Sequence, residues 1–121
     1  MSLDRYALDL LTSEVLYHTE RVAPGENPDP GAQGSRIGTL LRMARQEYEG
    51  TMEPLAVYRQ LILRVADIAA MTLVASSVVV NQKMAELDPD ADQPWDLDLK
   101  ELLVHIGEIA ERHPRYDGDS Q

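Results

Sequence analysis

The chain has 121 residues, of which 44% are hydrophobic, and a formal net charge of −10 at pH 7. This length fits one domain of residues 1–121, and the apolar content excludes disorder along the whole chain. The absence of cysteine excludes disulfides, thiolate zinc sites and cysteine nucleophiles, and it fits a cytoplasmic protein. The acidity disfavours direct binding to nucleic acid, because phosphate backbones carry charge of the same sign.

The first predicted helix covers residues 3–23, where apolar side chains recur on one helical face after Ser2 as N-cap. Residues 24–34 contain three prolines and three glycines, so we expect a mobile loop there. A second helix is expected to follow Ser35 as its N-cap and to end at Gly50.

The third predicted helix begins near Pro54 and continues to Leu87 without an internal glycine or proline. Its segment Val65–Val80 is apolar nearly all round, which predicts a helix that is covered on most sides. The segment is 16 residues long and contains Asp67, whereas about 20 apolar residues are needed to span a bilayer, so no membrane span is expected. The β-branched run Val78–Val80 leaves a strand as the alternative.

The last predicted helix covers residues 97–113, with Asp96 as its cap, and residues 114–121 are expected to form a frayed tail. These elements predict an all-α protein, a four-helix bundle with a long central helix. One chain has few helices with which to cover the central one. We therefore expect a homo-oligomer, a dimer or larger, to complete the bundle.

Glu14 and His18 lie four residues apart and share a helical face with apolar neighbours. Such a pair suits acid–base catalysis or metal binding inside a bundle. The alternative is that the two side chains satisfy each other at the wetter end of the helix, since unpartnered polar groups are costly to bury.

Asp67 is the acidic residue inside the most apolar segment, and Arg64 lies three residues before it. A structural ion pair between them is one interpretation. The other is a metal cluster of Asp67 with Glu14 and His18, whose ligand types suit Mg²⁺ or Mn²⁺ better than zinc.

Two further polar sets are predicted to be solvent-facing. The last helix carries two pairs at i,i+4 spacing, Glu101–His105 and Glu108–Arg112. The second helix carries three arginines that either face solvent or form a small basic patch: Arg36, Arg42 and Arg45.

The run Arg36–Leu41 and the segment Tyr58–Met71 resemble the small MazG-type nucleotide pyrophosphohydrolases. The resemblance implies an all-α oligomer that cleaves nucleoside triphosphates to monophosphate and pyrophosphate with Mg²⁺. It also implies Glu47, Glu49 and Asp67 as metal ligands, because that family places paired carboxylates on two helices. The sequence departs from the family pattern, because Glu47 and Glu49 are two residues apart rather than three. Arg64 also stands where the second helix should carry a glutamate, and a relative with these changes would keep the fold without the chemistry.

The sequence thus supports three hypotheses of function. The first is a non-enzymatic helical module, without a cofactor, that self-associates or binds a protein partner and regulates it. The second is a Mg²⁺-dependent nucleotide pyrophosphohydrolase with the metal ligands above and Glu14 and His18 as accessory catalytic residues. The third is an acidic inhibitor that presents residues 88–101 to a basic protein surface.

Overall fold

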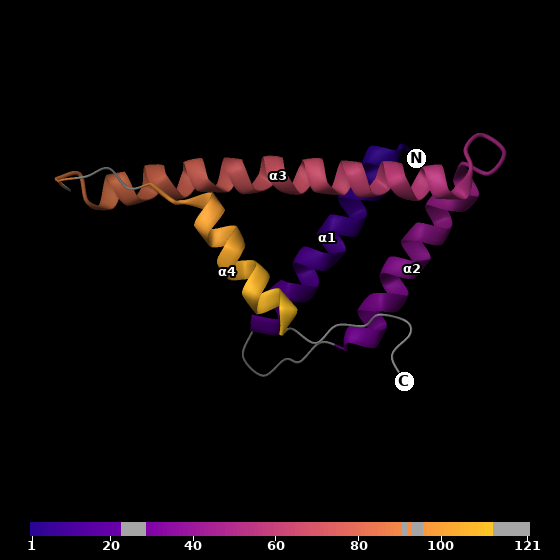
Figure 1. Cartoon of the computed structure of the whole chain (residues 1–121), viewed down its shortest axis with the longest axis horizontal. Coiled ribbons are helices and arrows are strands. Elements are labelled where there is room, and N and C mark those ends of the chain that lie inside the picture. The colour runs from indigo at the N-terminus through magenta and orange to yellow at the C-terminus, as the bar shows by residue number, and fades with distance from the viewer. Residues whose placement is uncertain (23–28, 91, 93–95, 113–121) are drawn as a thin grey trace. The chain divides into compact units, whose positions relative to one another are not determined.

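The computed structural model describes residues 1–22, 29–90, 92 and 96–112 (Figure 1). These residues form four helices and no strand: α1 (Leu3–Val22), α2 (Pro30–Glu47), α3 (Pro54–Leu87) and α4 (Leu99–Glu111). The all-α prediction is confirmed, and the strand alternative at Val78–Val80 is wrong. The bundle arrangement and its completion by oligomerisation stay predictions.

Contacts within the chain form two compact units. Unit 1 contains Met1–Ile68, with α1, α2 and the first part of α3. Unit 2 begins at Ala69 and contains the rest of α3 together with α4. A single domain over residues 1–121 stays a prediction.

The predicted start of α1 and both ends of α3 are confirmed. Ser2 caps α1, because its Oγ accepts a hydrogen bond from the backbone N–H of Arg5 at 3.2 Å. Pro54 is the first residue of α3, where its missing N–H leaves no hydrogen bond unmade. Gly50 lies in the turn before it with φ +83°, a backbone conformation that residues other than glycine rarely adopt.

The start of α2 differs from the prediction. The helix begins at Pro30, and Asp29 is the N-cap, with its Oδ1 accepting from Gly31 N–H at 2.9 Å. The predicted loop is therefore wrong for residues 30–34, and the predicted cap Ser35 lies inside the helix. Proline at the first helical position already has a helical φ, so here it starts a helix. Residues 24–28 of the predicted loop lie outside the described residues.

The cap of α4 also differs, because Asp98 accepts from the backbone N–H of Glu101 at 3.1 Å and Asp96 lies outside the helix. The helix ends at Glu111. The predicted tail, residues 114–121, lies outside the described residues.

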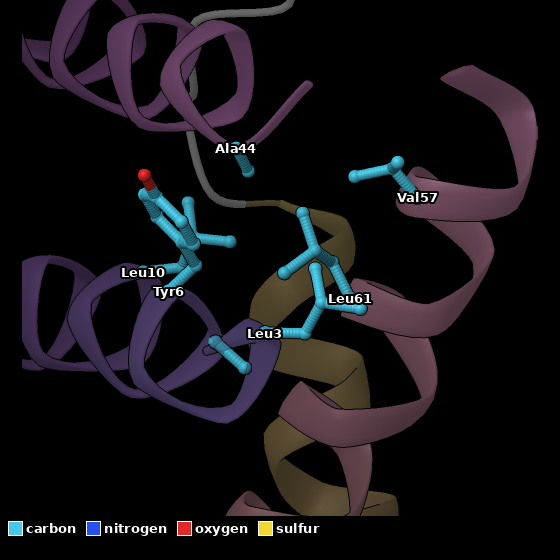
Figure 2. Close-up of a cluster of buried hydrophobic side chains, with 7 residues drawn as sticks. Leu3, Tyr6, Leu10, Ala44, Val57 and Leu61 are labelled. Carbon is cyan, nitrogen blue, oxygen red and sulfur yellow. The ribbon is translucent and has the colours of Figure 1, made fainter. Parts of the chain in front are cut away.

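The core of unit 1 is formed by side chains from three helices, as Figure 2 shows. Val57 and Leu61 of α3 are its largest fully buried side chains, and Ala44 of α2 packs with them. The contribution of α1 is Leu3, Tyr6, Ala7 and Leu10. Small residues on α1 and α2 lie fully buried beside larger ones, which allows dense packing without aromatic bulk.

Unit 2 has much less buried surface. Among its described residues only Ser77 is buried, and its hydroxyl donates to the carbonyl of Val74 at 2.7 Å. The side-chain amide oxygen of Asn81 accepts from Leu97 N–H at 3.0 Å, which ties the chain before α4 to α3. The expectation that Val65–Val80 is buried is wrong for the single chain, because most of these residues are exposed and α4 is the one other helix among the described residues of unit 2.

Candidate functional site

Glu14 and His18 lie on α1 as the spacing predicts, with 3.6 Å between His18 Nε2 and Glu14 Oε2. Both side chains are about half-exposed rather than facing a core. The Tyr17 ring meets the His18 ring edge-on, with the ring centroids 5.2 Å apart. This geometry supports the interpretation in which the pair satisfies itself at a wet helix face.

Glu14 is also held from α2 by Gln33, a residue that the sequence analysis did not identify. Gln33 is 5% exposed, and its amide nitrogen donates to Glu14 Oε1 at 2.8 Å and to Ser13 Oγ at 3.1 Å. Its amide oxygen accepts from Arg36 Nε at 3.1 Å. The amide therefore links α1 to α2, and no local sequence pattern reveals it because its partners lie on another helix.

Glu47, predicted as a metal ligand, takes part in a network at the other end of α1 and α2. Its Oε1 lies 2.6 Å from the amino nitrogen of Met1, and it accepts a hydrogen bond from the Tyr6 hydroxyl. Burial raises the pKa of Tyr6, and the negative charge of Glu47 adds to that rise. The Tyr48 hydroxyl donates to the carbonyl of Met1 at 3.0 Å. This carboxylate therefore has a structural role between two helices.

Glu49 and Asp67 are exposed and lie in different settings. Glu49 lines a polar hollow of about 740 Å³ at the turn between α2 and α3. Arg64, the expected partner of Asp67, instead forms an ion pair with Asp4 of α1 at 3.0 Å. Its guanidinium also donates to Gln60 in the preceding turn of α3.

The predicted metal ligands belong to no cluster of ion-binding side chains in the described part of the chain. Residues 1–22, 29–90, 92 and 96–112 contain no group of three or more histidine, aspartate or glutamate side chains placed to hold an ion. A Mg²⁺ site at Glu47, Glu49 and Asp67 stays a prediction of the resemblance.

The polar face of α4 contains neither of the two predicted side-chain pairs among the described residues. Arg112 Nε donates to the backbone carbonyl of Glu108 at 3.3 Å, rather than to its carboxylate. Glu101 and His105 line an open hollow beside α3 within unit 2.

One apolar surface is a groove in unit 1, called here the unit-1 groove, with a volume of about 570 Å³. It is lined by α1, α2 and α3, and the carboxylate of Glu14 is its one charged member. Ile62 stands on its edge and is 68% exposed. The remaining lining residues are Leu10, Leu11, Ile37, Leu41, Tyr58, Leu61, Val65 and Ala66.

Another apolar surface is on α3 in unit 2, and we call its residues Met71, Val74 and Val78 the α3 stripe. Their spacing of three and four residues places them on one helical face. Each is half-exposed or more: 57%, 54% and 50% in that order. An exposed row of large apolar side chains at helical spacing is typical of a surface that another molecule covers.

By length and composition, α3 is the one helix among the described residues that could cross a membrane. The core helix of a soluble protein passes the same criteria of length and composition. Asp67 and Lys83 bracket an uncharged run of 15 residues, Ile68–Gln82. As a helix this run is about 22 Å long, whereas the hydrocarbon core of a bilayer is about 30 Å thick.

No family model, curated protein or solved structure matches the chain.

Proposed function

We propose that this protein is a non-enzymatic helical interaction module that self-associates through the apolar surface of α3. The observation that carries the proposal is the exposure of the α3 stripe, Met71, Val74 and Val78, in the single chain. Removing apolar surface from water contributes roughly 25 cal/mol per Å², so a partner that covers the stripe gains affinity from that burial.

A second copy of the chain fits this stripe better than a bilayer or a nucleic acid. The stripe bears no charge, so packing two copies along it does not bring the acidic groups of this −10 chain face to face there. Ala75 flanks the stripe, and its small side chain allows two helices to approach closely. The uncharged run is about 8 Å shorter than a bilayer core, and the net charge repels phosphate backbones.

The test is the mass of the protein in solution, measured by light scattering over a range of concentrations. We expect a mass at least twice the 13.5 kDa of one chain. The double variant Val74→Gln/Val78→Gln should lower that mass while keeping the helical circular dichroism, because both residues are exposed and glutamine is a good helix former. Ser76→Gln, an exposed position outside the stripe, is the matched control and should keep the wild-type mass.

Two results would overturn the proposal. One is a monomer mass at every concentration. The other is an oligomer whose mass is the same in the double variant. Flotation of the protein with neutral phosphatidylcholine vesicles, lost in the double variant, would assign the stripe to a lipid surface instead.

A further inference from the structure

We propose that the unit-1 groove is a second self-pairing surface, in which two copies of the chain face each other across a two-fold axis. The inference goes beyond the proposed function, because it concerns another surface in the other unit. A two-fold contact uses the same patch on both copies, so the patch has to complement itself in shape and in charge.

The shape of the groove meets the first requirement. Leu61 lies on its floor and is 1% exposed, whereas the next residue, Ile62, stands on its edge and is 68% exposed. The lining is otherwise aliphatic apart from Tyr58 and Glu14. A raised isoleucine beside an aliphatic hollow can enter the hollow of a second copy, while its own hollow receives the isoleucine of that copy.

The charges around the groove meet the second requirement. Arg42 and Arg45 line an adjoining hollow of about 560 Å³, which shares Leu41 and Tyr58 with the groove. Neither arginine forms an ion pair with any residue of the described ranges, and both are exposed. Two cationic groups beside an apolar groove, in a chain of net charge −10, favour an acidic group on the molecule that covers it.

Glu14 supplies that acidic group at the opposite end of the groove. Its carboxylate accepts a hydrogen bond from Gln33, which lies nine residues before Arg42 on α2. Nine residues of helix are about 13 Å long, so Glu14 and Arg42 are separated by about that distance along α2. A two-fold axis between them reverses the second copy and brings its Glu14 towards Arg42 and Arg45 of the first. The same operation makes the reciprocal contact, so each dimer contains two sets of opposite charges.

The groove is tested in the Val74→Gln/Val78→Gln variant, in which association through the α3 stripe should be lost. Sedimentation equilibrium in this background should show a monomer–dimer equilibrium. Glu14→Lys alone or Arg42→Glu alone should raise the dimer dissociation constant by about tenfold or more, because each places like charges opposite each other twice. Combining Glu14→Lys with Arg42→Glu restores opposite charges and should return the constant to within about threefold of the background.

Arg59→Glu is the matched control for charge, because Arg59 is exposed on α3 and does not line the groove. It should leave the dissociation constant within about threefold of the background. Ile62→Asp tests the apolar contact without touching the Glu14–Gln33 bond, and it should abolish the dimer. Ile62 is largely exposed, so the folded monomer should keep its helical content.

The outcomes separate this inference from the proposed function. If the Val74→Gln/Val78→Gln protein is monomeric at every concentration, the groove pairing is overturned. The lower mass of this variant than of wild type would still support self-association through the α3 stripe. Unchanged dissociation in both single charge variants and in Ile62→Asp also overturns it. If Glu14→Lys unfolds the chain, Arg42→Glu and Ile62→Asp decide the question. Capture of an acidic amphipathic peptide by the groove, without any dimer, would assign it to another partner.

Discussion

Unit 1 and unit 2 share α3, yet they use it in opposite ways. In unit 1 the helix has Val57 and Leu61 fully buried against α1 and α2, and Arg64 forms an ion pair with Asp4 of α1. In unit 2 the same helix is more continuously apolar but buries only Ser77 among the described residues. The number of neighbouring helices, rather than the hydrophobicity of a segment, therefore decides whether the segment is buried.

The largest expected difference between the units is the cost of truncating a core leucine. Leu61→Ala should destabilise the protein by about 3 kcal/mol, because a fully buried leucine leaves a cavity when shortened. Leu102→Ala in unit 2 should cost about 1 kcal/mol or less, since Leu102 is only partly buried. Urea unfolding followed by circular dichroism measures both. Equal losses would mean that unit 2 is packed as tightly as unit 1.

The next largest effect should come from the buried amide that links α1 to α2. Gln33→Leu should cost about 1–2 kcal/mol, because Gln33 is 5% exposed and satisfies Ser13, Glu14 and Arg36 together. Ser77→Ala, at the buried polar position of unit 2, should cost less than about 1 kcal/mol, since the hydroxyl bonds only within its own helix. Thermal melts of the two variants give the comparison. A Gln33→Leu protein as stable as wild type would contradict the structural role of the amide.

The elements that the sequence predicted well are those with local signals. Ser2 as the cap of α1, Pro54 at the start of α3 and its uninterrupted course to Leu87 all follow from residues near each boundary. The start of α2 also has a local signal, because Asp29 before Pro30 is a cap followed by a first-turn proline. The high proline and glycine content of residues 24–34 nevertheless favours a loop over the same residues, which is why the prediction differs from the structure there.

The contacts that the sequence could not predict are those made between helices. The spacing of Glu14 and His18 predicted that their side chains lie close together, but Gln33 reaches Glu14 only because α1 packs on α2. Arg64 lies one turn from Asp67 and nevertheless pairs with Asp4, sixty positions away in the sequence. The exposure of the α3 stripe is of the same kind, because it depends on which faces other helices cover.

A smaller effect concerns how the free energy of unfolding decreases at high pH, because Tyr6 in unit 1 titrates there. Burial and Glu47 raise the pKa of Tyr6 above its ordinary value of 10.0. Above pH 10 the unfolded chain loses the phenolic proton while the folded chain retains it. The contribution of Tyr6 to the free energy of unfolding is therefore fully present below pH 10 and is lost as pH rises through the folded pKa. Tyr6→Phe should cost about 1 kcal/mol at pH 7, from the lost hydrogen bond, and should make the decline above pH 10 shallower.

The measurement is the free energy of unfolding of both proteins at pH 7, 9, 10 and 11. If the Tyr6→Phe protein declined as steeply as wild type above pH 10, the titration of Tyr6 would not contribute to stability there.

The smallest expected effect is that of metal and nucleotide on unit 1, where Glu47, Glu49 and Asp67 lie. An interaction module should melt at the same temperature with or without an excess of Mg²⁺ or Mn²⁺ and a nucleoside triphosphate. A specific ligand at 100 times its dissociation constant would add about 2.7 kcal/mol, which shifts the melting temperature of a chain of this size by several degrees. Glu47 already meets Tyr6 and the Met1 amino group, so drawing it into an ion site would break a structural network. A shift that needs both metal and triphosphate, and disappears in Asp67→Asn, would therefore support the pyrophosphohydrolase hypothesis over an interaction module.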